Sequence, residues 1–225
     1  MNVMRQSWND VSFLHWRYDP AVVRPLVPRG LELDGFDGAA WIGLVPFHIS
    51  GLTLPKAPSI PYLSYFPETN VRTYATDHTG RSGVWFFSLD AARVLAVAGA
   101  RAGYGLPYYW AKMAVECDGR TARYRSERRY GPRAASDLEV KIGEPIVKQS
   151  ALEVFLTMRL RLYALRLGRL WKADVAHPPW PLQQAAAVRV EESLVRAAGL
   201  PAPAGAPLTH YAKRIDVLVG PPAPL

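Results

Sequence analysis

Residues 104–113 read YGLPYYWAKM, and this stretch decides how the rest of the chain is interpreted. Its glycine and proline predict a tight turn, and the residues that follow predict a β-strand. Tyr108, Trp110 and Lys112 fall on one face of that strand because side chains alternate along it. A strand that presents two hydrogen-bonding groups and an indole on one face is typical of the wall of a ligand pocket.

Alternating and apolar runs on both sides of this stretch predict a protein with many strands and few helices. Strands are expected at residues 11–17, 31–34, 39–49, 69–76, 84–89, 184–192 and 208–219. Helices are expected at residues 20–26, from an Asp90 cap to about residue 102, and from a capping box at Ser150 to Gly168. The proline-rich residues 51–67 predict an ordered loop over one end of the sheet. Together these elements predict a mixed α+β fold.

Length and composition indicate a globular protein with one core. The chain has 225 residues, of which 49% are hydrophobic, and we expect one domain over residues 1–225 with an unstructured end at 220–225. No apolar run is long enough to span a membrane, and the first residues lack the apolar segment of a signal peptide. A single cysteine, Cys117, excludes an internal disulfide. The expected location is therefore the cytoplasm.

The formal charge of +8 raises the question of nucleic-acid binding. The basic residues are mostly dispersed, and the densest patch, residues 120–133, alternates so that Arg123 and Arg125 share one face of a strand. A solvated sheet face explains this pattern better than a nucleic-acid site. The five histidines are scattered without metal-ligand spacing, and no glycine-rich loop precedes a helix. We therefore expect neither a metal nor another cofactor.

Several separated motifs, in the same order, resemble the YqjF-like family, also called domain of unknown function 2071. The resemblance runs essentially end to end and is carried by residues 70–74 (NVRTY), 83–90 (GVWFFSLD), 105–109 (GLPYY), 177–182 (HPPWPL) and 210–217 (HYAKRIDV). It implies the acetoacetate decarboxylase-like fold, which is a mainly antiparallel sheet closed into a cone-like barrel around a cavity, with a few flanking helices. The family's function is unknown, and fold alone does not supply one.

The resemblance also shows where this chain departs from the decarboxylase. In that enzyme a similar turn is followed by two lysines, the first of which forms a Schiff base with the keto acid. Here Tyr108 and Tyr109 follow Gly105-Leu106-Pro107, so the Schiff-base route does not carry over. Tyr108 is the better catalytic candidate, as a hydrogen-bond donor to a carbonyl or enolate. Lys112 and His15 are further candidates for moving protons, although a solvent-facing lysine and a satisfied sheet histidine are the plainer alternatives.

A second candidate group lies on the strand at residues 69–76. Asn70 and Arg72 share a face, and this neighbourhood resembles the segment from which the decarboxylase supplies a cavity carboxylate, with Glu68 at the adjoining loop edge. A buried arginine needs an anionic partner, which is either a ligand carboxylate or an internal acid such as Glu68 or Asp90. Trp85 and Tyr109 complete the expected ligand-contacting residues.

Two functions follow from these candidates. The first is a cofactor-free enzyme of the lyase or isomerase type that acts on a small keto or enol organic acid. The second is a non-catalytic protein that binds or senses a small molecule in the same cavity. A third alternative is a filled scaffold, if Trp85, Phe87 and Tyr109 close the cavity. Exposed edge strands could pair between copies of the chain, so a homo-oligomer is a further alternative.

Overall fold

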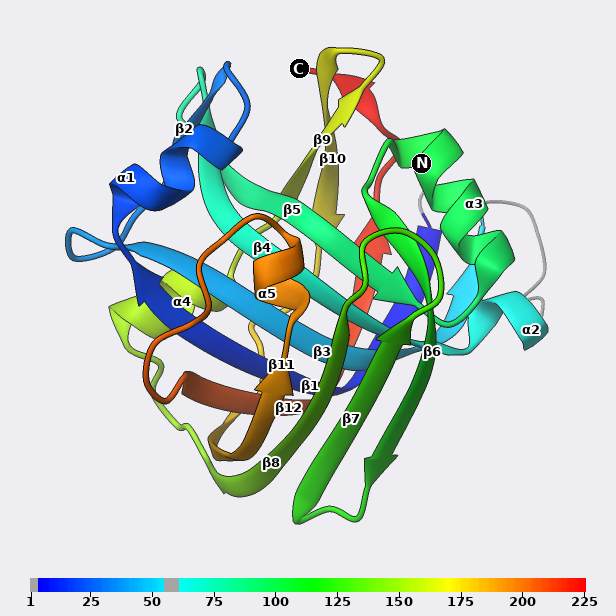
Figure 1. Cartoon of the computed structure of the whole chain (residues 1–225), viewed down its shortest axis with the longest axis vertical. Helices are drawn as coiled ribbons and strands as arrows, with labels where there is room; N and C mark the ends of the chain where they lie inside the picture. The colour runs from blue at the N-terminus through cyan, green and yellow to red at the C-terminus, as the bar shows by residue number, and fades with distance from the viewer. Residues whose placement is uncertain (1–3, 55–60) are drawn as a thin grey trace.

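A computed structural model describes residues 4–54 and 61–225, and within these ranges it consists mainly of β-strands (Figure 1). The strands are β1 Met4–Tyr18, β2 Leu31–Leu33, β3 Ala40–Thr53, β4 Phe66–Asp77, β5 Ser82–Ala91, β6 Tyr108–Cys117, β7 Thr121–Arg128, β8 Ala135–Pro145, β9 Arg161–Arg166, β10 Arg169–Ala176, β11 Leu182–Glu192, β12 Leu208–Val219 and β13 Ala223–Pro224. The helices are α1 Pro20–Val23, the 3-10 helix η1 Arg24–Leu26, α2 Pro61–Ser64, α3 Val94–Tyr104, α4 Ala151–Thr157 and α5 Leu194–Ala197.

All the strands described belong to one sheet, in the order β13-β10-β9-β5-β6-β7-β8-β11-β12-β1-β3-β4-β2. Two additional pairings, β4 with β5 and β10 with β12, connect strands that are distant in this order. In the described part of the chain, β5 pairs in parallel with β6 and β9, and the other pairings are antiparallel. Figure 1 shows α2 and α3 at one side of the sheet and α1 and α4 at the opposite side. The predicted mixture of a mainly antiparallel sheet with few helices is thus confirmed.

The helix predicted from Ser150 to Gly168 begins as expected but is much shorter. Glu153 N–H donates to Ser150 Oγ over 3.2 Å, and the Ser150 N–H donates to the Glu153 carboxylate over 2.6 Å, which completes a capping box. The helix ends at Thr157, and the residues from Arg161 form β9 instead. Pairing of β9 with both β5 and β10 outweighs the helical spacing of its apolar residues.

Asp90 does not cap a helix, which corrects the second helix prediction. It lies inside β5, is fully buried, and accepts hydrogen bonds from Arg128 at 2.6 and 3.0 Å. The following helix, α3, starts at Val94 and ends where predicted, because Gly105 adopts a left-handed conformation with φ of 71°. The Asp90 carboxylate, which the sequence analysis assigned to a helix start, therefore forms a buried ion pair with Arg128 instead.

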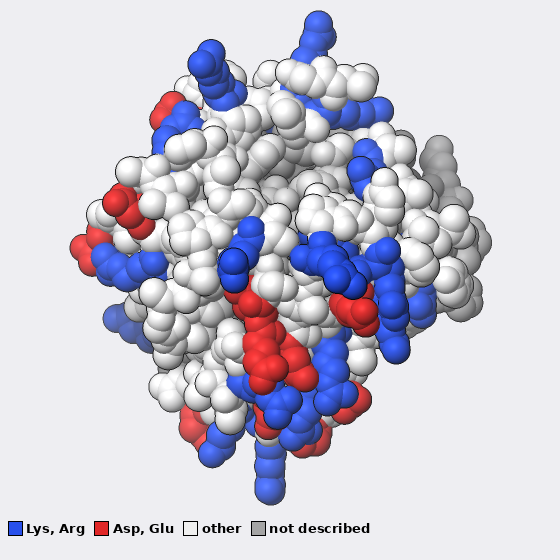
Figure 2. Space-filling model, viewed as in Figure 1, with Lys and Arg blue, Asp and Glu red and all other residues white. Residues whose placement is uncertain are grey.

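Arg123 and Arg125 of β7 lie on the solvated sheet face that the sequence predicts, whereas Arg128 at the end of the strand is buried. Arg123 pairs with Glu139 at 3.3 Å and Arg125 pairs with Asp137 at 3.5 Å, in both cases across to β8. Figure 2 shows positive and negative side chains intermingled over the lower part of the molecule, where Figure 1 places β7 and β8. The cations of this face are therefore neutralised locally by acidic neighbours.

Three further expectations concern segments at the edges of the fold. The loop predicted over residues 51–67 is only partly described: β3 continues to Thr53, α2 and β4 account for its end, and residues 55–60 lie outside the described part. The end predicted to be unstructured contains β13, which pairs with β10. No helix in the described ranges is both long and apolar enough to cross a membrane.

Candidate functional site

A cavity of about 320 Å³ lies beside the inner face of β4 and is bordered by α3. Its wall is mainly apolar, and its aromatic members are Trp8, Phe47, Phe66, Phe86, Tyr104, Tyr108 and Trp180. Polar side chains enter it from β4, where Glu68, Asn70 and Arg72 all line the cavity. These three residues alternate along one strand, so the pleat places them on the same face. A mainly apolar cavity with a few converging polar groups is the usual form of a small-molecule site.

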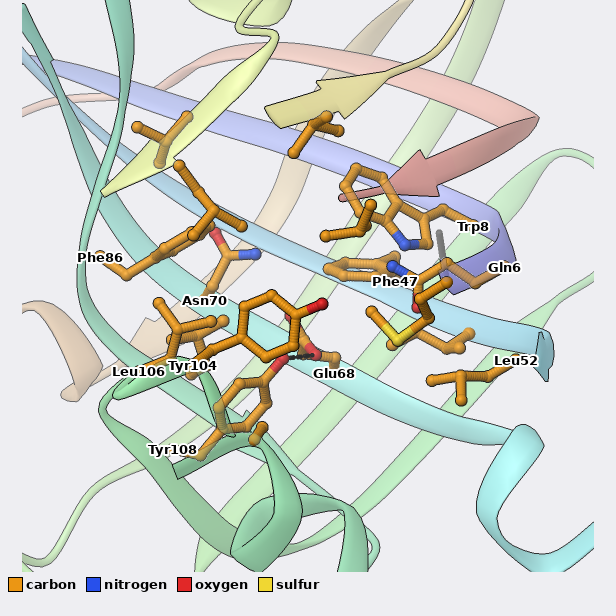
Figure 3. Close-up of a pocket in the computed structure, with 18 of the residues that line it drawn as sticks. Gln6, Trp8, Phe47, Leu52, Glu68, Asn70, Phe86, Tyr104, Leu106 and Tyr108 are labelled. Carbon is orange, nitrogen blue, oxygen red and sulfur yellow. Dashed lines mark hydrogen bonds between the residues drawn. The ribbon is translucent and has the colours of Figure 1, made fainter. Parts of the chain in front are cut away.

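Glu68 and Tyr108 form a hydrogen-bonded pair in this cavity. The Tyr108 hydroxyl donates to Glu68 Oε2 over 2.8 Å (Figure 3). The two residues come from β4 and β6, and β5 lies between these strands and pairs with both: Glu68 is opposite Ala91, and Tyr108 is opposite Leu89. The pair is therefore assembled by the register of three neighbouring strands.

Burial controls the protonation of this pair. Only 3% of Glu68 is exposed, and desolvation raises the pKa of its carboxyl to about 7, although the hydrogen bond from Tyr108 acts in the opposite direction. Burial and the neighbouring Glu68 carboxylate raise the pKa of Tyr108 well above its usual range. At neutral pH, Glu68 is consequently divided between its acid and base forms, while Tyr108 remains a donor. A carboxyl with this pKa can both accept and return a proton.

Arg72 carries a buried positive charge that has no carboxylate partner among the described residues. Two other arginines line the same cavity, and both are paired: Arg159 with Asp34, and Arg161 with Asp77 at 2.9 Å. Arg72, which is only 7% exposed, makes no ion pair with any described residue. The residues outside the described ranges, 1–3 (MNV) and 55–60 (PKAPSI), contain no acidic side chain that could supply one.

The existing contacts of Arg72 leave much of its hydrogen-bonding capacity unused. Its Nη2 donates to the Leu156 carbonyl oxygen over 3.4 Å, and its guanidinium lies 5.5 Å from the ring centre of Phe13 and 5.8 Å from that of Tyr74. Within the described part of the chain, Arg72 Nε and the neighbouring Asn70 Oδ1 have no hydrogen-bond partner. Buried polar atoms are normally paired, so these atoms indicate a site for a polar ligand group.

Four of the residues proposed from the sequence are thus brought together in the cavity, and four lie elsewhere. Lys112 is exposed on β6, well beyond the point where that strand borders the cavity. His15 is buried beneath the site, where its Nε2 lies 2.6 Å from the Tyr74 hydroxyl and burial lowers its pKa well below the usual value. Trp85 lines a second hollow, and the Tyr109 ring stacks 3.9 Å from the Arg128 guanidinium.

The apolar wall contains residues that the sequence analysis did not propose. Trp8 packs against Phe47 with ring centres 5.1 Å apart and against Trp180 at 5.9 Å. Tyr104, at the end of α3, also lines the cavity, and its hydroxyl donates to the Gly220 carbonyl oxygen over 3.1 Å. Alternation along β1 was the available signal for Trp8, but nothing local distinguishes such residues from ordinary core. Among the described residues, no three metal-binding side chains cluster.

Comparison with known proteins places this geometry in a family. Residues 5–216 match the model of domain of unknown function 2071, which is described as an uncharacterized conserved protein. The chain is also similar to the uncharacterized protein YqjF of Bacillus subtilis, with 42% identity over 221 residues that cover 97% of this chain and 91% of that protein.

Solved structures with the same fold are enzymes of low sequence identity. The enduracididine biosynthesis enzyme MppR complexed with pyruvate superposes with a TM-score of 0.70 at 14% identity, covering 100% of this chain and 90% of that one. Acetoacetate decarboxylase from Legionella pneumophila gives a TM-score of 0.68 at 14% identity, covering 98% of this chain and 86% of that one. These likenesses show the acetoacetate decarboxylase-like fold.

Proposed function

The chain belongs to the domain of unknown function 2071 family, and from that premise we propose that it is a cofactor-free enzyme acting on a keto or enol organic acid. The observation that carries this proposal is the buried, unpaired guanidinium of Arg72 in the wall of a cavity. Leaving a charge buried without a partner is costly, and a bound carboxylate would relieve that cost through charge-assisted hydrogen bonds. The pyruvate bound by a protein of the same fold supports a carboxylate ligand.

The proposed chemistry is proton transfer next to a carbonyl group. With the substrate carboxylate on Arg72, the Glu68 carboxylate removes a proton from the carbon beside the substrate carbonyl. The electron pair of the broken C–H bond moves onto the carbonyl oxygen. Once Glu68 has taken the proton, the Tyr108 O–H, which donates to the Glu68 carboxylate before the reaction, turns to the enolate oxygen and stabilises it by a hydrogen bond. Return of the proton from Glu68 to a different atom gives an isomerisation. Glu68 thereby takes the role that the sequence analysis considered for His15 or Lys112.

The second candidate function is non-catalytic binding of a small molecule. It is favoured by the mainly apolar wall, because Arg72 and Asn70 suffice to orient a ligand without proton chemistry. The filled scaffold is disfavoured, since Trp85 and Tyr109 leave a cavity of about 320 Å³ open. Cone-like closure of the sheet, a cytoplasmic location, the absence of nucleic-acid binding and a homo-oligomer stay predictions.

Thermal-shift measurements against keto acids test the binding step. A ligand at a hundred times its dissociation constant should stabilise the wild type by about 2.7 kcal/mol. Arg72→Met should abolish the shift, whereas Arg214→Met, which removes an exposed arginine on β12, should retain it. Circular dichroism verifies that both variants fold. An equal shift in Arg72→Met would refute the carboxylate anchor.

Hydrogen–deuterium exchange of a bound keto acid tests the catalytic step. In D₂O the wild type should exchange the protons beside the carbonyl faster than buffer does, and NMR follows their loss. Glu68→Gln should bind the acid but lose this exchange. If ligands bind and Glu68→Gln exchanges them as fast as the wild type, Glu68 is not the base. If the wild type exchanges no faster than buffer, the binding function replaces the enzymatic one.

A further inference from the structure

We infer that the acid bound in this cavity carries an extended apolar body, so that its preferred ligand is a medium-chain or aryl-substituted keto acid rather than a short one. This inference rests on the proposed function, because it takes the carboxylate to lie on Arg72. It adds the direction in which the rest of the molecule runs and the size of its apolar part. Three features of the cavity carry it: its volume, the order of its lining residues, and the small side chains of α3.

The volume exceeds the needs of a short keto acid. A cavity of about 320 Å³ has the space of roughly ten water molecules at ~30 Å³ each. Pyruvate has only six non-hydrogen atoms and would leave a large part of this space unfilled. An apolar cavity filled with water or left empty forgoes favourable contacts with its wall. A ligand of about ten non-hydrogen atoms matches the space better.

Strand register orders the lining residues from a polar inner end to an apolar mouth. Along β3, Gly43 is opposite Arg72, Phe47 is opposite Glu68, and Ile49 is opposite Phe66. The same strand then continues through Leu52 and ends at Thr53; Leu52 and the following Leu54 line the cavity as well, and Leu54 is 56% exposed. The guanidinium, the Glu68 carboxyl and the apolar mouth therefore follow one another along a single strand direction.

This order sets the orientation of the ligand. Arg72 and Glu68 are four residues apart, which is about 13 Å along an extended strand. A carboxylate held by Arg72 directs the rest of the acid past Asn70 and Glu68 toward Ile49, Phe66 and the mouth. Figure 3 shows Trp8, Phe47 and Leu52 together on one side of the cavity, away from Asn70 and Tyr108. The part of the ligand beyond Glu68 thus meets a mainly apolar wall, whose polar groups include Gln6, the Trp8 indole N–H, the Tyr104 hydroxyl and His177.

Small residues on α3 keep the mouth open. Ala96, Gly99 and Ala100 line the cavity, and a Cβ placed on Gly99 would meet no atom within 4 Å. Leu95 lines the same end and is 60% exposed. In contrast, Ala98 on the same helix is exposed and lies outside the lining. A larger side chain at position 100 should therefore compete with the ligand for space, while the same change at position 98 should not.

A chain-length series of straight 2-oxo acids tests the inference. Isothermal titration calorimetry would compare pyruvate, 2-oxobutyrate, 2-oxohexanoate and 2-oxooctanoate, each acid against its methyl ester. Affinity of the wild type should rise about four-fold per added methylene, the factor that corresponds to ~0.8 kcal/mol. Ala100→Leu should weaken 2-oxooctanoate by at least about ten-fold, the effect of two displaced methylenes, and leave pyruvate nearly unchanged. Ala98→Leu should behave as the wild type does.

The outcomes separate this inference from the proposed function. If affinity is independent of chain length but is lost in Arg72→Met, the apolar body is refuted and the acid-binding function stands. If affinity rises with chain length equally for acids and esters, and survives Arg72→Met, the carboxylate anchor is refuted together with the acid class. If no member of the series binds, both are refuted. The inference and the proposed function are both supported if affinity rises with chain length for the free acids but not for the esters, if it is lost in Arg72→Met, and if Ala100→Leu weakens only the longer acids.

Discussion

Replacing Glu68 by glutamine should make the protein more stable, and increasingly so as the pH rises. The folded state raises the pKa of Glu68 from 4.5 to about 7. Between these values the folded protein binds a proton that the unfolded chain has released, so the wild type loses stability with rising pH and the loss levels off above pH 7. At ~1.36 kcal/mol per pKa unit, the full penalty is about 3 kcal/mol. Glutamine does not ionise and escapes this penalty.

Urea denaturation at a series of pH values measures the effect. The advantage of Glu68→Gln over the wild type should grow by about 2–3 kcal/mol between pH 5 and pH 8, which corresponds to roughly 5–10 °C in melting temperature for a chain of this size. Histidines and other acids titrate alike in both proteins, so the difference isolates Glu68. An advantage that stays constant across this range would show that Glu68 has an ordinary pKa. Tyr108→Phe provides a second check: because the lost hydrogen bond lowers the pKa of Glu68, its removal should move the midpoint of the pH dependence upward.

Further substitutions test the surrounding structure through urea denaturation. Arg128→Leu should cost about 3–5 kcal/mol by leaving Asp90 buried without its partner, and a loss below about 1 kcal/mol would contradict the importance of that pair. Gly83→Ala should lower the free energy of unfolding by about 1–3 kcal/mol, because its Cβ would lie 2.6 Å from a tyrosine ring and 2.9 Å from a backbone carbonyl oxygen. Gly99→Ala should raise the free energy of unfolding by about 0.5–1 kcal/mol, because its Cβ would meet no atom within 4 Å. Similar effects at both sites would refute this difference in packing. Ser150→Ala should cost about 1 kcal/mol through loss of the capping box, and an unchanged midpoint would show that this cap does not stabilise α4.

Most strands could be predicted from the sequence because their alternation is a local property. The helix from Ser150 could be predicted only at its start, where the capping box is also local. Its end could not, because Tyr163, which continues the helical spacing of the apolar residues after Ser150, belongs to β9, where its hydroxyl donates to the Arg81 carbonyl oxygen over 2.6 Å. Asp90 was misassigned for the same reason, since its partner Arg128 lies on a strand far along the chain.

The candidate site was predictable to the extent that it lies on single strands. Asn70 and Arg72 were found because they alternate on β4, and Tyr108 because it opens β6. The same rule misplaced Lys112, which shares the face of Tyr108 but sits where β6 has passed beyond the cavity. Residues on one face of a strand point the same way but can lie far apart along it. The hydrogen bond between Tyr108 and Glu68 joins two different strands, so no periodicity in the sequence predicts it.

A β-bulge in β5 is the feature that makes this pairing possible. Arg72 is opposite Phe86, but Val71 is opposite Ser88, so β5 has one extra residue at Phe87. Phe86 and Leu89 consequently both line the cavity although they are three residues apart, which a regular strand would not allow. Tyr108 is opposite Leu89 in the parallel pair and takes its side of the sheet from it. Without the bulge, Leu89 and with it Tyr108 would turn away from Arg72, so a local irregularity in β5 brings the cationic anchor Arg72 and the Glu68–Tyr108 pair into one cavity.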